Sequence, residues 1–221
     1  MSWTGLSQWW MREIETDPSY DEVVTPLLLE ILEPERRAVY FDLGSGEGRV
    51  MRSVESTGAF SYGLERNETL AARSGRQAVV AELPDIPLRS GSIDGTYAVL
   101  VLEHLSDHIS FFSEAARVVR SGGVLALVSN HPVWTAPGSS PIEDHDGEPL
   151  WRAGDYFSDG TTEIPTGGGP VTFHHRSMSN LLNTAADAGW SLQKMIERPH
   201  HKLENQMGIQ RLWGCRWRLQ I

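Results

Sequence analysis

The sequence predicts an α/β fold in which helices cover both faces of a parallel sheet, and three observations predict it. Short apolar runs alternate with segments of helical periodicity between residues 38 and 129, which indicates repeated strand–helix units. Residues 95–102 form an uncharged, largely apolar run, as expected of a central strand that is covered on both faces. Residues 39–50 pass from an apolar run through a glycine-rich turn into a helical pattern.

The individual elements follow from the same patterns. Apolar residues at helical spacing predict a helix at residues 5–15 that ends before Pro18, and a second from Tyr20 to Leu32, with Pro26 in its first turn or at a kink. Strands are expected at 38–43, 60–64, 77–81, 94–101 and 122–129, and helices at 47–57, 67–75 and 107–120. The pattern then predicts a helix at 177–188, an edge strand at 190–197 and a final strand near 208–219.

We expect one domain with four parts. Residues 1–36 form N-terminal helices that pack over a ligand site, 37–129 form the ligand-binding core, and 177–221 complete the domain. Between them, residues 130–176 have no clear periodicity, and an insertion of this length in a compact domain is usually functional or disordered. Its aromatic residues argue against disorder. We therefore expect a cover that faces the substrate, with Trp134 and Trp151 as candidates for the pocket wall.

Composition limits the classes of partner. The net charge of −10 and the scattered basic residues argue against nucleic-acid binding, which requires clustered Lys and Arg. No apolar run reaches the ~20 residues of a membrane-spanning helix. The N-terminus lacks the features of a signal peptide, and the single cysteine, Cys215, suits a reducing compartment. We expect a cytoplasmic monomer or homodimer that binds neither nucleic acid nor membrane; no paired Cys and His ligands suggest a metal site.

The glycine turn runs from Asp42 to Gly48, with glycines that allow unusual backbone angles and close approach of a ligand. A dinucleotide fingerprint has glycines at its first, third and sixth positions, but here the third glycine comes one residue early. Glu47 would also repel a pyrophosphate, whereas Asp42 would form an ion pair with an ammonium group. The turn therefore favours an adenosyl-amino-acid ligand over a nucleotide, and a turn without a ligand is the alternative.

Glu65 ends the second apolar run, 65 − 44 = 21 residues after Gly44. This is close to the ~20 residues that separate a glycine turn from the carboxylate that holds ribose hydroxyls. Such a carboxylate can accept both hydrogen bonds. The alternative is that Glu65 belongs to the start of the next helix, for which Asn67 is a better cap.

These residues carry a resemblance to the class I S-adenosylmethionine-dependent methyltransferases, of the compact methyltransferase 11 group. Matching motifs occur in order from about residue 37 to residue 129. They are the turn 42–48, Glu65, the segment 82–94, Val101-Leu-Glu-His-Leu105, and Arg117-Val-Val-Arg-Ser-Gly-Gly123. The resemblance implies a Rossmann-like sheet of seven mostly parallel strands, the last antiparallel, and S-adenosyl-L-methionine as the cofactor.

The resemblance also implies the cofactor contacts. The methionine part is expected to bind Asp42 and the turn residues Gly44, Ser45 and Gly46, the backbone carbonyl of Val99, and Tyr20 from the second helix. Glu65 is expected to hold the ribose. Glu82 and the main-chain N–H of Leu83 are expected to bind the adenine, although many relatives carry the shorter Asp at position 82. All of these positions except Tyr20 lie at or near the carboxyl ends of predicted strands, where ligands bind in such sheets.

Two histidines are candidates for catalysis. His104 follows the fourth strand and His131 follows the fifth, and an imidazole there could take a proton from an attacking hydroxyl. A packing role beside the cofactor is the alternative for each. The sequence favours a methyltransferase that acts on an oxygen or nitrogen of a small molecule. The alternatives are an RNA or protein methyltransferase, and a non-catalytic domain that binds S-adenosylmethionine.

Overall fold

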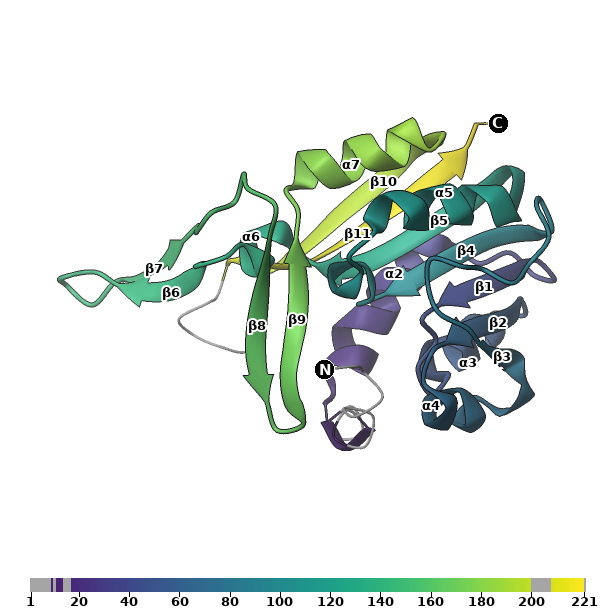
Figure 1. Cartoon of the computed structure of the whole chain (residues 1–221), viewed down its shortest axis with the longest axis horizontal. Coiled ribbons are helices and arrows are strands. Elements are labelled where there is room, and N and C mark those ends of the chain that lie inside the picture. The colour runs from purple at the N-terminus through teal and green to yellow at the C-terminus, as the bar shows by residue number, and fades with distance from the viewer. Residues whose placement is uncertain (1–8, 10, 14–16, 200–207, 221) are drawn as a thin grey trace.

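The computed structural model describes residues 9, 11–13, 17–199 and 208–220, and its centre is a seven-stranded sheet (Figure 1). The strand order is β10-β11-β5-β4-β1-β2-β3. Neighbouring strands from β3 to β5 are parallel, and β11 lies antiparallel between β5 and β10. The strands are β1 (Val39–Leu43), β2 (Phe60–Glu65), β3 (Ala78–Val80), β4 (Ile93–Val99), β5 (Val119–Asn130), β10 (Trp190–Pro199) and β11 (Gln210–Leu219). The predicted fold class, including the antiparallel last strand, is confirmed.

Helices cover the two faces of this sheet. One apolar cluster joins the sheet to α2 (Thr25–Leu32) and α3 (Arg49–Glu55), and the other joins it to α5 (His108–Val118) and α7 (Met178–Asp187). Along β5, Leu125 and Leu127 belong to one cluster and Ala126 to the other, because successive residues of a strand point to opposite faces. The other helices within residues 17–199 are η1 (Tyr20–Val24), α4 (Glu68–Arg73), η2 (Gly75–Gln77), η3 (Leu102–His104) and α6 (Pro132–Thr135).

The N-terminal region agrees with the expected second helix but divides it in two. A π-helical turn, η1, leads into α2, and Pro26 lies in the first turn of α2 rather than at a kink. A proline is tolerated there because its missing N–H would have no partner within the helix. Most of the helix expected at residues 5–15 lies outside the described residues. Within the described part of the chain, no helix is long and apolar enough to cross a membrane.

The insertion contains regular structure that its sequence did not predict. Two antiparallel hairpins follow α6, and their strands are β6 (Ser140–Glu143), β7 (Pro149–Arg152), β8 (Gly160–Thr166) and β9 (Gly169–His175). Figure 1 shows the first hairpin extending away from the sheet. These strands are short and partly exposed on both faces, so they lack the apolar alternation that would have predicted them.

Candidate functional site

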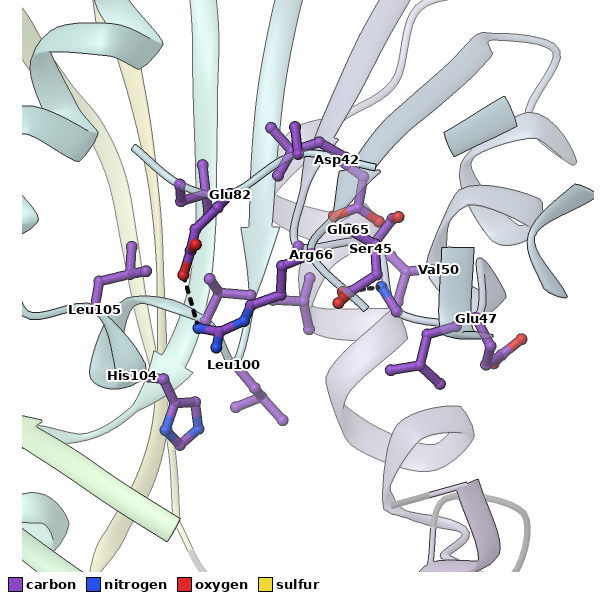
Figure 2. Close-up of a pocket in the computed structure, with 18 of the residues that line it drawn as sticks. Asp42, Ser45, Glu47, Val50, Glu65, Arg66, Glu82, Leu100, His104 and Leu105 are labelled. Carbon is purple, nitrogen blue, oxygen red and sulfur yellow. Dashed lines mark hydrogen bonds and ion pairs between the residues drawn. The ribbon is translucent and has the colours of Figure 1, made fainter. Parts of the chain in front are cut away.

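A cavity of about 230 Å³ lies at the carboxyl ends of β1, β2 and β4 (Figure 2). All of the residues that the sequence assigned to the cofactor line it, and so does His104. These residues are Tyr20, Asp42, Gly44, Ser45, Gly46, Glu65, Glu82, Leu83 and Val99. They meet because parallel pairing places the carboxyl ends of β1, β2 and β4 side by side.

Asp42 is a carboxylate in an unfavourable position. Its side chain is only 2% exposed, and its Oδ1 atom has no hydrogen-bond partner among the described residues. Burial raises the pKa of Asp42 well above its ordinary value, and the nearby charge of Glu65 raises it further. A buried, incompletely paired carboxylate is costly unless a cation compensates it. The position therefore suits the ammonium group of a ligand.

Glu65 is held by backbone hydrogen bonds at the end of β2. Its two carboxylate oxygens accept from the N–H groups of Gly46, at 3.1 Å, and Asn67, at 2.8 Å. Burial raises the pKa of Glu65, and these two hydrogen bonds oppose the increase. The cap of α4 comes from the side chain of Asn67, which accepts from the N–H groups of Thr69 and Leu70. Glu65 therefore points across the cavity toward the glycine turn, in a fixed orientation (Figure 2).

The glycine turn brings the backbone of the β1–α3 connection close to the segment that follows β4. Gly44, Gly46 and Gly48 have φ angles of +94°, +54° and +87°, which favour glycine. A Cβ atom on Gly44 would lie 2.6 Å from Cγ2 of Val101, whereas a Cβ atom on Gly46 would meet nothing within 4 Å. The sequence predicted the unusual backbone angles of these glycines, but not the contact between Gly44 and Val101.

Gly44→Ala is therefore expected to destabilise the protein more than Gly46→Ala. Both substitutions carry the strain of a positive φ, about 1 kcal/mol. Only Gly44→Ala adds an overlap with Val101, which overpacking data place at roughly 1–3 kcal/mol more. In thermal melts the two variants should differ by roughly 2–12 °C, at about 2–4 °C per kcal/mol for a chain of this size. Equal melting temperatures would contradict the close approach.

An ion pair that the sequence analysis did not predict also lines the cavity. Nη1 of Arg66 lies 3.1 Å from Oε1 of Glu82, and both side chains line the cavity (Figure 2). Both groups are partly exposed, so the pair contributes little to stability. The only signal for Arg66 in the sequence is its position directly after Glu65.

Tyr20 reaches the cavity from η1, as expected. The Cζ atom of Arg49 lies 5.4 Å from the centre of its ring. Burial raises the pKa of Tyr20, and the charge of Glu103 adds to the increase, so the phenol stays protonated at neutral pH. It can therefore donate a hydrogen bond to a carboxylate.

His104 lies in η3, with its ring in the cavity wall (Figure 2). Its Nδ1 atom is 3.0 Å from the carbonyl oxygen of Thr172 in β9, and its ring packs on Phe173 at a centroid distance of 4.7 Å. A carbonyl can only accept a hydrogen bond, so Nδ1 carries the proton in the neutral ring. Nε2 is then the nitrogen that can accept a proton from another group.

The prediction that His131 reaches the same cavity is wrong. His131 is the N-cap of α6: its Nδ1 accepts from the N–H of Val133 at 3.1 Å, and its Nε2 lies 2.7 Å from Glu197. It does not line the cavity. The prediction that Trp134 and Trp151 line it is also wrong: neither residue is part of the cavity wall, and their rings stack on each other at a centroid distance of 4.9 Å. The contacts of His131 with Glu197 come from a distant part of the chain, which the sequence pattern could not reveal.

Three comparisons place this site among known proteins. Residues 41–127 match the family described as a methyltransferase domain. An O-methyltransferase of Pyrenophora dematioidea is 28% identical over 125 residues, which are 51% of this chain and 47% of that protein. A protein of Mycolicibacterium smegmatis, named as a probable S-adenosylmethionine-dependent methyltransferase, is 31% identical over 102 residues, 44% of this chain and 40% of that protein. The chain thus spans less than half the length of these two curated relatives.

The fold has a clear counterpart among solved structures. An S-adenosylmethionine-dependent methyltransferase from Mesorhizobium loti superposes with a TM-score of 0.81 at 22% identity, covering 92% of this chain and 99% of that one. The likeness confirms the fold. The match of residues 41–127 to the methyltransferase domain, with the likeness to the named relative, confirms the resemblance to the class I methyltransferases.

Proposed function

We propose that this chain, whose residues 41–127 form a methyltransferase domain, transfers a methyl group from S-adenosylmethionine to an oxygen or nitrogen of a small molecule. The observation that carries the proposal is the pair of carboxylates at the ends of β1 and β2. Asp42 is buried with an oxygen that has no partner among the described residues, and Glu65 is oriented by backbone N–H groups. One suits an ammonium group and the other suits a pair of hydroxyls, and the cofactor carries both.

Each contact of the cofactor is assigned to a residue of the cavity. Asp42 binds the ammonium group, the glycine turn and the carbonyl of Val99 surround the methionine part, and the phenol of Tyr20 donates to the carboxylate. Glu65 accepts from the ribose hydroxyls. Glu82, which pairs with Arg66 through Oε1, accepts from the adenine amino group, and Leu83 donates its N–H to the ring.

The protein is expected to act mainly by orientation. When bound, S-adenosylmethionine supplies a methyl group that its sulfonium already activates. The protein has to hold an acceptor in line with that group, and orientation of this kind can lower a barrier by ~7–11 kcal/mol. His104 accepts the proton of the acceptor hydroxyl or amine at Nε2, while Thr172 keeps the proton of Nδ1 in place. We assign no part of the transfer to His131.

Two features support a small acceptor. The cavity wall beside His104 includes the apolar residues Leu100, Val101 and Leu105 as well as Ser106 and Asp107, and the insertion hairpin β8–β9 contacts His104. The net charge of −10 disfavours an RNA acceptor, because phosphate contacts require clustered cations. The curated relative from Pyrenophora dematioidea is named as an O-methyltransferase, which is consistent with an oxygen acceptor.

Binding and turnover test the proposal separately. Calorimetry with S-adenosylhomocysteine, the product form of the cofactor, is expected to give one site per chain. Incubation with S-adenosylmethionine labelled in its methyl group and a panel of small hydroxylated and amino compounds is expected to yield a labelled product. Binding without label transfer to any acceptor class would support a non-catalytic domain, and label in RNA or protein would contradict the small-molecule acceptor. Absence of binding would overturn the proposal.

A further inference from the structure

Arg176 is a buried arginine between β9 and α7, and the proposed mechanism does not use it directly. Its side chain is only 7% exposed. Nη2 donates to the carbonyl oxygens of Leu105, at 2.6 Å, and Ser106, at 2.8 Å. Nη1 lies 3.4 Å from the carbonyl oxygens of Leu102 and His174. Arg176 does not line the cavity.

Three of these acceptors belong to the segment of residues 102–106, which follows β4. This segment begins with the single turn of η3, in which Leu105 donates its N–H to Leu102. The carbonyl groups at the end of so short a helix have no partners within it. The carbonyl oxygen of Leu102 already has the N–H of Leu105 as a partner, whereas those of Leu105 and Ser106 follow the turn, and the guanidinium supplies donors for both of them.

The same segment forms part of the cavity wall through His104, Leu105 and Ser106. It is tied to the insertion a second time, by the hydrogen bond between Nδ1 of His104 and the carbonyl of Thr172. Thr172 lies in β9, four residues before Arg176. Side chain and backbone from one short stretch of the insertion therefore fix both the path of the segment and the orientation of the imidazole.

We propose that Arg176 is a positioning residue for His104: it holds segment 102–106 so that the imidazole keeps Nδ1 on Thr172 and turns Nε2 toward the acceptor. The role rests on the proposed function of the cavity. It requires arginine in particular, because a planar guanidinium directs five donors in fixed directions, whereas the ammonium group of lysine is a single point with three donors. Lysine could not reach carbonyls on both sides of the turn at once.

Arg176→Lys, compared with Arg216→Lys, tests this role. Arg216 is a matched control, because it also donates to backbone carbonyls at the end of a helix, those of Ile31 and Leu32 in α2, and does not line the cavity. Both variants are expected to lower the melting temperature. Only Arg176→Lys should also lower kcat for methyl transfer, by about tenfold or more, with affinity for S-adenosylhomocysteine within about threefold of wild type. Equal kcat in the two variants would overturn the proposal.

A readout that does not depend on turnover separates this proposal from the function itself. Nitrogen-15 NMR of the imidazole groups, with His104→Gln to assign the signal, is expected to show His104 protonated at Nδ1 in the wild type and as a mixture of tautomers in Arg176→Lys. An unchanged tautomer would overturn the positioning role, whether or not an acceptor has been found.

If Arg176→Lys does not fold, hydrogen exchange in the wild type tests the role instead. The amides of His104 and Leu105 should then exchange together with those of β9. If the amides of His104 and Leu105 exchange faster than those of β9, the positioning role of Arg176 is contradicted.

Discussion

Asp42→Asn is expected to weaken the binding of S-adenosylhomocysteine by about 100-fold or more and, at the same time, to raise the melting temperature of the ligand-free protein. Removing one partner of a buried ion pair costs about 3–5 kcal/mol, which corresponds to that loss of affinity. Without ligand, however, the Asp42 carboxylate lies buried near Glu65, and an amide of the same shape removes the buried charge. A gain of about 1 kcal/mol would raise the melting temperature by roughly 2–4 °C.

The pH dependence follows from the direction of the pKa shift. Burial raises the pKa of Asp42 in the folded protein above its unfolded value, so folding favours the protonated form. The free energy of unfolding of the ligand-free protein should therefore decrease as the pH rises from the unfolded pKa through the folded pKa. The advantage of Asp42→Asn should grow over the same interval. Wild-type affinity for the ammonium-bearing ligand should increase with pH in this interval, as Asp42 ionises, and the variant should lack the increase.

Asp94→Asn is a matched control with the opposite sign. Asp94 lies at the start of β4 and accepts from the N–H of Val39 and from Arg120, each at 2.7 Å. Burial raises its pKa, but these two hydrogen bonds outweigh burial and leave the pKa below its ordinary value. Asp94→Asn should lower the melting temperature at neutral pH and leave ligand affinity unchanged. Calorimetry that finds near wild-type affinity in Asp42→Asn would show that Asp42 does not bind the ammonium group.

The sequence predicted the candidate site best where a single strand leads directly into the turn that follows it. The apolar run into Asp42, the glycines after it and the position of Glu65 are local signals, and parallel pairing then places them together without further information. The central strands were also predictable, since residues 95–99 of β4 and 124–128 of β5 are buried on both faces and are almost entirely apolar. Strand ends were predicted less accurately: β5 begins at Val119, three residues before the predicted strand.

Contacts between distant segments were not predictable from local pattern. His131 follows the fifth strand as expected, but Glu197 in β10 pairs with its ring across 66 residues of sequence. The hydrogen bond from His104 to Thr172 and the contacts of Arg176 with three carbonyls of segment 102–106 likewise depend on how the insertion folds back on the sheet. Local sequence specifies which residue types end the strands, and tertiary packing then decides which of them face the cavity.

His104→Gln is expected to lower the rate of methyl transfer by about 10²–10⁴-fold, the usual contribution of a general base. The glutamine amide can still donate a hydrogen bond to the carbonyl of Thr172, but it has no nitrogen that can accept a proton. Affinity for S-adenosylhomocysteine should stay within about threefold of wild type, because the proposed cofactor contacts involve other residues.

His108→Gln controls for the loss of an imidazole from the same region. Nε2 of His108 lies 2.8 Å from Oδ1 of Asn180, and the residue does not line the cavity. Burial lowers its pKa, and the charge of Arg176 lowers it further, so the ring is neutral near pH 7 and its replacement should leave the rate within about threefold. If His104→Gln transfers methyl groups as fast as His108→Gln, removal of a proton by His104 does not contribute to the rate of transfer. Transfer would then depend on orientation alone, with His104 as a packing residue on Phe173.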